Sequence, residues 1–300
     1  MSAGYAPGYP GAGYPATVSP TAWARPDRRV RPVDPGQAGL YCRVLGPLEC
    51  AVDGVTVHLG GPTPRRLLAA LSAAHGVPVA DAALAELVWQ GRPTPEVVAA
   101  LRVLVSRLRS ALGPDARCRL HRDSAGYSLD LPDAATDHGR FRASVGLGRR
   151  LLAEGAPSEA IGVLEAALAL WRGQPWPELD DAPLATGARA GLVELREVAV
   201  EEVQAAHLEL GDVATAVAAL SAAVITAPYR ERRWELLALG LYRSARQAHA
   251  LAQLRRARSV FLGELGVRPG PALCELERRI LAHDPTLQLP GPARATVGAG

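Results

Sequence analysis

Hydrophobic positions between residues 39 and 134 begin with strand-like spacing. Three short β-prone runs, Tyr41–Leu45, Leu48–Val52 and Val55–Leu59, are separated by Gly46-Pro47 and Asp53-Gly54. Asp-Gly between β-prone runs is a strong hairpin signal, so we predict three short antiparallel strands. Their turns would let two cysteines, Cys42 and Cys50, face each other across a hairpin, and burial as free thiols is the simpler interpretation.

The period then becomes helical. Proline is favoured at the start of a helix, and glycine followed by proline ends one, so these residues bracket the expected elements. We predict a helix over Arg65–His75 behind Pro64, a second from Asp81 as N-cap to Trp89, a third from Thr94 or Pro95 to Leu112, and a β-hairpin over 117–131 with its turn at Asp123–Gly126.

The third of these helices has two distinct faces. On a helical wheel its apolar side would pack on the first two helices, and this side carries Leu101, Val105, Leu108 and Leu112. The opposite side is small and uncrowded, and it carries Ala99, Val103, Ser106 and Ser110. Arg102 and Arg109 flank this small side on one edge and Arg107 on the other, while Arg109 lies nearer the core and is expected to pair within the fold.

From residue 135 to 285 the pattern is helical throughout and contains a repeat. The segments 211–220 and 245–254 share a frame of small and apolar residues 34 positions apart, and 155–164 fits the same frame. A 34-residue helix-turn-helix period is typical of tetratricopeptide repeats. The spacing between the copies at 155–164 and 211–220 is longer than 34 residues and predicts an insert. This insert would contain Trp171-Arg172-Gly173 and the loop Pro175–Asp181.

The two ends of the chain lack any apolar period. Residues 1–38 are rich in Gly, Pro, Ala and Tyr, and residues 286–300 form a second Pro/Gly/Ala segment. Such segments bury too little surface to offset the entropy of ordering, so both are predicted to be disordered tails. The predicted domains are therefore 39–134 and 135–285.

Composition excludes several kinds of chemistry. All 33 basic residues are arginine, so a P-loop lysine or a Schiff base to pyridoxal phosphate is excluded. The cysteines and histidines show no metal-ligand spacing, and no hydrolase motif or phosphate cradle occurs. We therefore expect no enzyme activity, no catalytic residue, no metal and no cofactor. With neither a signal sequence nor a run of about 18 apolar residues, we expect a cytoplasmic protein without a membrane contact.

Positive charge gathers on the third helix and the hairpin after it. Residues 102–122 hold six arginines and one acid, Asp115, although the whole chain has a net charge of only +3. Residues 135–285 hold eighteen arginines and nineteen acids, so that region offers no net field to DNA. A local basic patch of this kind is the electrostatic footprint of nucleic-acid binding.

Several local motifs, in order, resemble one bacterial family. They are Val44-Leu45-Gly46-Pro47-Leu48, the run from Val105 to Arg109 followed by Leu112-Gly113, Gly126-Tyr127, the run from Ala169 to Gly173, the run from Leu241 to Ser244, and the run from Glu264 to Gly270. Over residues 40–287 the chain resembles the Streptomyces antibiotic regulatory protein (SARP) family. The expected fold is thus an α+β winged helix-turn-helix domain followed by an all-α, tetratricopeptide-like bacterial transcriptional activator domain.

The resemblance implies a transcriptional activator of secondary-metabolite genes. It would bind promoter direct repeats as a homodimer and recruit RNA polymerase through its sigma subunit. Such a protein would be nucleoid-associated in the cytoplasm. The candidate contacts to double-stranded DNA are Arg65, Arg66, Arg102, Ser106, Arg107, Arg122 and Tyr127. Among these, Arg122 lies just before the hairpin turn, where it could enter a narrow minor groove.

One departure from the family keeps a second hypothesis open. Val98, Ala99 and Ala100 stand where the family usually has polar residues, and none of the three side chains can donate a hydrogen bond. The chain could therefore be an interaction scaffold or sensor whose winged helix has weakened DNA binding, since helical repeats form peptide-binding grooves.

Trp176 is the candidate for a contact between domains or with a partner. It lies between two prolines in a loop that cannot be helical. We expect it to plug the helical domain against the winged domain and so to fix the angle between them.

Overall fold

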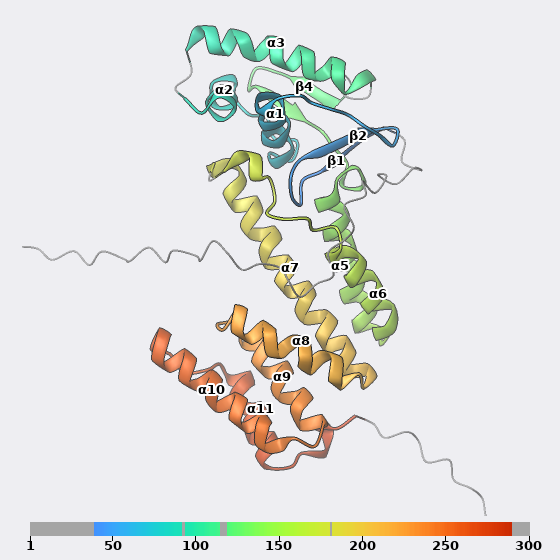
Figure 1. The fold of residues 1–300 in the computed structure, drawn as a ribbon, viewed down its shortest axis with the longest axis vertical. Coiled ribbons are helices and arrows are strands. Elements are labelled where there is room, and N and C mark those ends of the chain that lie inside the picture. Colours follow the sequence, from blue (N-terminus) through green and yellow to red (C-terminus); the bar gives the residue numbers. More distant parts are fainter. Residues whose placement is uncertain (1–38, 92–93, 115–118, 181, 290–300) are drawn as a thin grey trace, which may run out of the picture. The chain divides into compact units, whose positions relative to one another are not determined.

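The N-terminal strands form a small antiparallel sheet in the order β1-β2-β3 (Figure 1). The structure, a computed structural model, describes residues 39–91, 94–114, 119–180 and 182–289, all within one compact unit. The strands are β1 (Leu40–Arg43), β2 (Glu49–Val52) and β3 (Val55–Thr56). The third strand is shorter than predicted, since it ends at Thr56 rather than Leu59.

The register of this sheet places Cys42 directly opposite Cys50, which confirms the predicted pairing. Both are buried free thiols, as the simpler interpretation expected. Burial raises the pKa of both groups, that of Cys50 to about 11. These thiols therefore stay protonated and serve as small apolar core residues.

Three helices follow the sheet: α1 (Pro62–Ala73), α2 (Asp81–Trp89) and α3 (Pro95–Ala111). Two predicted starts need correction. Helix α1 begins at Pro62, two residues before Pro64. Asp81 is the first helical residue of α2 rather than its N-cap, which is Ala80, and the Asp81 carboxylate binds Arg122 instead of capping the helix.

The predicted second hairpin is present as β4 (Leu120–Arg122) and β5 (Tyr127–Leu129). Residue Gly126 has a φ of +139°, and a Cβ there would lie 2.0 Å from the carbonyl oxygen of Val79. Only glycine allows this approach, which lets Val79 and Tyr127 exchange backbone hydrogen bonds of 2.8 and 3.0 Å. The hairpin is thereby fastened to the segment that leads into α2.

The rest of the described chain is helical (Figure 1). After the short turn η1 (Asp133–Ala135) come α5 (Asp137–Ala153), α6 (Pro157–Leu168), η2 (Pro177–Leu179), α7 (Pro183–Leu210), α8 (Val213–Thr226), α9 (Glu231–Arg243), α10 (Gln247–Leu265), α11 (Pro271–Leu281) and η3 (Pro285–Leu287). Residues 286–289, assigned to the tail from the sequence, belong to the fold, because Leu287 is buried and its carbonyl accepts a hydrogen bond from Arg243.

The repeat frame has a direct structural meaning. Its first residue has a left-handed backbone in all three copies, with φ of +76° at Gly155, +80° at Gly211 and +58° at Ala245. The shared small and apolar positions of the frame are all buried: Ala160 and Leu164, Ala216 and Leu220, and Ala250 and Leu254. Each copy is therefore a turn followed by a helix, α6, α8 or α10, whose small residue allows close packing.

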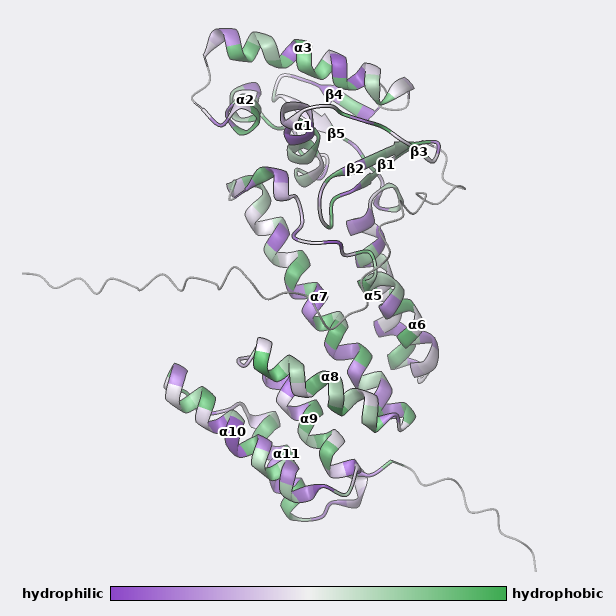
Figure 2. Ribbon diagram, in the orientation of Figure 1, coloured by the Kyte–Doolittle hydropathy of each residue, from purple (hydrophilic) through white to green (hydrophobic). Residues whose placement is uncertain are grey.

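The buried side chains form two hydrophobic clusters, and these do not separate at residue 134. One cluster joins β1, α1 and α3 to α5, α6 and the first part of α7, as far as Val203. The second begins at Leu208 and extends to Leu287. Figure 2 shows that hydrophobic and hydrophilic residues alternate along α3 and the later helices, as expected for helices with one buried side. The sheet and α1 thus share a core with the start of the helical region.

Candidate nucleic-acid interface

The interface candidate is built on helix α3. Its start is fixed by Thr94, whose Oγ1 accepts a hydrogen bond of 3.4 Å from the backbone N–H of Val97, with Pro95 as the first helical residue. This confirms the predicted start. Leu101, Val105 and Leu108 are buried, so the apolar side of the helix packs inward as the wheel predicted.

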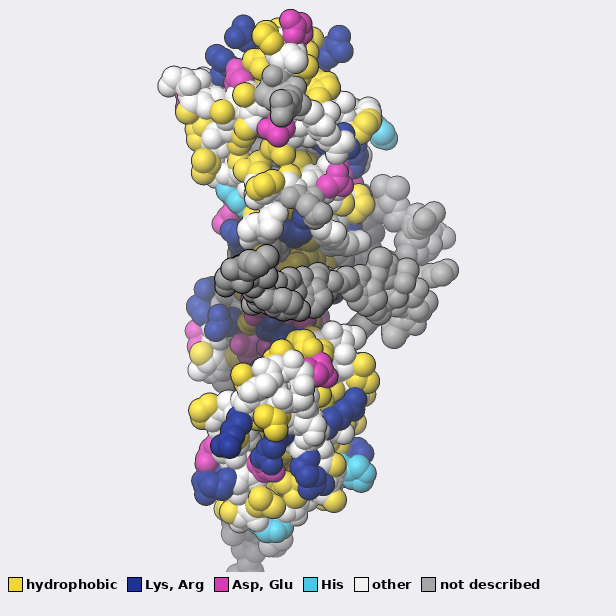
Figure 3. Space-filling view, turned by 90° about the vertical axis from the view of Figure 1, so that its left-hand side faces the viewer, with side chains coloured by type: hydrophobic (Ala, Val, Ile, Leu, Met, Phe, Trp, Pro, Cys, Tyr) yellow, Lys and Arg dark blue, Asp and Glu magenta, His cyan; other side chains and the backbone are white. Residues whose placement is uncertain are grey.

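The opposite side of α3 is open. Arg102, Val103, Ser106 and Arg107 are all exposed, and Val103 has 52 % of its surface accessible. Within the described part of the chain, neither Arg102 nor Arg107 forms an ion pair. Figure 3 shows arginine side chains on either side of hydrophobic ones at the end of the molecule that carries α3. Among the residues that the structure describes, no acid pairs with either guanidinium group, so both can bind an external anion.

Arg109 behaves differently, as predicted. Its Nη2 donates a hydrogen bond of 2.5 Å to the carbonyl oxygen of Leu120 in β4. This bond joins α3 to the second hairpin within the fold, so Arg109 is a structural residue.

Glu96 is a residue of this surface that the sequence reasoning missed. It is exposed in the first turn of α3, and its helical position puts it on the same side as Ala99 and Val103. A hydrogen bond with Thr94 lowers the pKa of its carboxyl, which is therefore charged at neutral pH. A carboxylate at this point repels phosphates and can accept a hydrogen bond from cytosine N4.

The two hairpin candidates are engaged within the fold. Arg122 forms an ion pair of 2.9 Å with Asp81, and its guanidinium lies 5.3 Å from the centre of the Tyr127 ring. The Tyr127 residue is only 3 % exposed, so its ring is part of the core. The structure thus places Arg122 against α2, with its side chain still 44 % exposed, and leaves Tyr127 no free face for DNA.

The candidates on α1 also differ from each other. Arg65 donates to the carbonyl oxygen of Leu48 at 2.6 Å and to Glu178 Oε1 at 2.9 Å, so its charge is already paired. Arg66 is half-buried beside a hollow of about 390 Å³, which Arg65 and the acids Glu178 and Asp180 also line. Two arginines and two acids balance there, so this hollow offers no net attraction to an anion.

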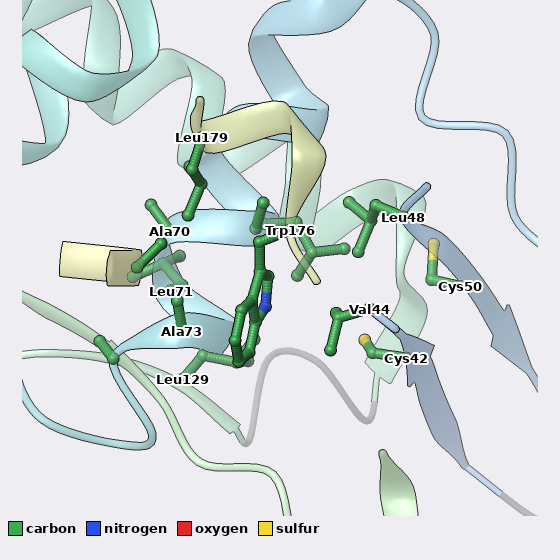
Figure 4. Close-up of a cluster of buried hydrophobic side chains, with 14 of the residues drawn as sticks. Cys42, Val44, Leu48, Cys50, Ala70, Leu71, Ala73, Leu129, Trp176 and Leu179 are labelled. Atoms are coloured by element: carbon green, nitrogen blue, oxygen red, sulfur yellow. The ribbon is translucent and has the colours of Figure 1, made fainter. Parts of the chain in front are cut away.

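Trp176 is fully buried, and its contacts join the two halves of the chain (Figure 4). Its indole Nε1 donates a hydrogen bond of 2.9 Å to Ser72 Oγ in α1, and its backbone N–H donates one of 3.0 Å to Val44. The ring lies among apolar side chains of α1, the β1–β2 turn and η2, including Ala70, Ala73, Val44 and Leu179 (Figure 4). The loop over 171–180 is therefore fastened to α1 and the β1–β2 turn.

A second polar anchor supports the same contact, and sequence reasoning missed it. Asp137, at the start of α5, is 0 % exposed, and its carboxylate accepts hydrogen bonds of 2.8 and 3.0 Å from the N–H groups of Val44 and Leu45. Arg172 reaches the same carboxylate at 3.7 Å and donates to the carbonyl oxygen of Pro47 at 2.9 Å. Burial raises the pKa of Asp137 against the opposing effects of these bonds.

Two histidines lie beside Trp176. His138 in α5 is 3 % exposed, and its Nε2 is 3.3 Å from Nδ1 of His75, two residues after the end of α1. The His138 and Trp176 ring centres are 5.5 Å apart. Burial, together with His75 and Arg142, lowers the pKa of His138 to about 3, and burial also lowers that of His75. Both rings are therefore neutral in the folded protein at neutral pH.

Other kinds of site find no support within the described ranges. No group of three or more Cys, His, Asp or Glu residues in those ranges could hold a metal ion. Among the helices that the structure describes, none is long and apolar enough to cross a membrane.

Comparison with known proteins gives one family and several relatives. A model described as "Bacterial transcriptional activator domain" matches residues 136–281. The transcriptional regulator RedD of Streptomyces coelicolor is 35 % identical over 286 residues, covering 89 % of this chain and 80 % of RedD. The transcriptional regulatory protein EmbR of Mycobacterium tuberculosis is 35 % identical over 245 residues, covering 81 % of this chain but only 63 % of EmbR.

The structural comparison agrees. A solved structure of Mycobacterium tuberculosis EmbR in complex with a low-affinity phosphopeptide superposes with a TM-score of 0.75 at 34 % identity. The match covers 82 % of this chain and 66 % of that one, so the chain spans about two thirds of EmbR.

Proposed function

The chain belongs to the SARP family of transcriptional regulators, and from this membership and the open face of α3 we propose that it binds promoter DNA with α3 in the major groove. In this proposal α2 and α3 form the helix-turn-helix of a winged domain, and the β4–β5 hairpin is the wing. Helix-turn-helix proteins place their second helix in the groove and hold the flanking phosphates with basic residues.

The observation that carries the proposal is the pair of arginines on α3. Arg102 and Arg107 flank Val103 and Ser106, and neither makes an ion pair with any residue that the structure describes. Two of the other predicted arginines, Arg65 and Arg122, already have acidic partners. We therefore assign the main DNA contacts to Arg102, Ser106 and Arg107. Arg66 is an accessory contact in this proposal, and Arg122 contributes only if it leaves Asp81.

We propose a protein-binding role for the helical region. Its balanced charge offers no net field to DNA, and stacked helix pairs present extended surfaces to other proteins. In this proposal it contacts RNA polymerase and its sigma subunit, and it pairs two copies of the chain on promoter direct repeats. The regulated genes would be those of a secondary-metabolite pathway, and the effect would be activation.

A selection experiment tests this function. The full chain is incubated with random double-stranded DNA, bound sequences are enriched at two salt concentrations, and the resulting site is footprinted in the neighbouring intergenic regions. The proposal expects one enriched motif, present as a direct repeat and protected in the footprint. Failure to enrich any motif at moderate salt would contradict it.

The same experiment separates the second candidate function, an interaction scaffold with weakened DNA binding. Ala99 and Ala100 are exposed on α3 and carry no hydrogen-bonding side chain, which favours this alternative. A scaffold would bind a protein partner with unchanged affinity in the presence and absence of DNA, and it would enrich no sequence.

A further inference from the structure

The centre of the open face of α3 is apolar. Ala99 and Val103 are four residues apart and so lie one above the other on the helix, and both are exposed. Val103 exposes 52 % of its surface, whereas Leu101, Val105 and Leu108 of the same helix are buried. More than half of this valine is left uncovered by the fold and can meet another surface.

The residues that flank Val103 indicate which surface it would meet, if the proposed DNA binding holds. Arg102 and Arg107 lie on opposite sides of Val103 along the helix, and both are exposed and unpaired within the described ranges. Contacts from both arginines to the two phosphate strands would bring the side chains between them against the base edges. Val103 would then sit at the floor of the major groove.

The major groove offers one methyl group, the C5-methyl of thymine. The hydrogen-bond donors and acceptors there would lose water against Val103 and gain no partner. We propose that Val103, with Ala99 beside it, is a specificity-determining contact that selects thymine at its position in the operator by packing on the methyl group. This inference rests on the proposed DNA-binding function and extends it to the base that is read.

Deoxyuridine provides the test, because it differs from thymine only by the missing methyl group. Each thymine of the selected operator is replaced singly by deoxyuridine, and affinity is measured by fluorescence anisotropy with the full chain. We expect one or two positions to lose affinity about fourfold, the value for one buried methyl group, with little change elsewhere.

Variants of the protein assign that effect to a residue. Val103→Ala should bind the thymine operator less tightly and lose its sensitivity to deoxyuridine at those positions, because the two changes remove the same contact. Val55→Ala, which changes another highly exposed valine, is the matched control and should keep full sensitivity. Far-UV circular dichroism and thermal melting establish that both variants are folded.

The outcomes separate this inference from the function on which it rests. Specific binding that no deoxyuridine substitution weakens would overturn the thymine contact and leave the DNA-binding function intact. Sensitivity that persists in Val103→Ala would also overturn it, because another residue would then read the methyl group. Failure of the chain to bind any selected sequence would overturn both.

Discussion

Removal of the Trp176 indole should separate the loop over 171–180 from α1. The side chain is completely buried, and its Nε1 bonds to Ser72. Truncation to alanine removes the ring, while the backbone N–H of residue 176 can still donate to the carbonyl of Val44. The change therefore tests the packing of the side chain, because the backbone hydrogen bonds of the loop can still form.

The structure sets the size of the effect. Replacement of a buried tryptophan by alanine costs about 3–5 kcal/mol of unfolding free energy, and the lost hydrogen bond contributes about 1 kcal/mol of that range. Ser72 Oγ keeps its bond of 2.8 Å to the carbonyl of Ala69, so its own donor is not left unpaired. We expect a loss of about 4 kcal/mol for Trp176→Ala. Trp176→Phe, which keeps an aromatic ring, should lose about 1–2 kcal/mol.

Two measurements are combined: urea denaturation monitored by far-UV circular dichroism, and hydrogen exchange of the backbone amides. Exchange should become faster at the backbone N–H groups of Arg172 and Trp176, which donate to Leu45 and Val44. Trp89→Ala is the control, because Trp89 is 36 % exposed and should cost less than about 1 kcal/mol. Two results would refute the idea that the Trp176 indole holds the loop over 171–180 against α1. They are a loss of unfolding free energy below about 1.5 kcal/mol for Trp176→Ala, and unchanged hydrogen exchange in the loop.

Three further results are expected. Below pH 6.5 His138 becomes protonated in the unfolded chain, but in the folded protein, where its pKa is about 3, it stays neutral. The free energy of unfolding should therefore fall by about 1 kcal/mol for each unit by which the pH is lowered. His138→Gln should flatten this slope. An unchanged slope in that variant would contradict the burial argument. Gly126→Ala should lower the unfolding free energy by more than about 3 kcal/mol, since its Cβ would meet the Val79 carbonyl, and a thermal melt like that of the wild type would exclude this. Glu96→Gln should raise DNA affinity about two- to fivefold at low salt by removing a negative charge from the binding face, and equal affinity would place Glu96 away from DNA.

Much of the local structure could be predicted because its causes are close in sequence. Thr94-Pro95 fixes the start of α3, the turns put Cys42 opposite Cys50, and the repeat frame gives the buried small residues of α6, α8 and α10. Each of these features depends on residues that are close to one another in the sequence. The same holds for the division of α3 into a buried and an open face.

The partners of charged residues were less predictable because they lie far away in sequence. Arg65 binds Glu178, 113 positions away, and the Asp137 carboxylate binds the N–H of Val44, 93 positions away. Periodicity gives the face on which a residue lies, but not which loop later covers that face. Glu96 is a different omission, since its outward position follows from the helical wheel alone.

The central claim is that α3 holds DNA through Arg102 and Arg107, and the salt dependence of binding tests it most directly. Affinity for the selected operator is measured from 50 to about 200 mM salt for the full chain and for three variants, Arg102→Ala, Arg107→Ala and Arg255→Ala. Arg255, in α10, is also exposed and makes no ion pair within the described ranges, so it controls for the loss of one charge. The account predicts that each α3 variant loses about 1–3 kcal/mol of binding free energy, with the slope of log affinity against log salt reduced by about 1 where the arginine holds a phosphate, and that Arg255→Ala changes neither. Equal slopes and affinities for all four proteins would contradict it.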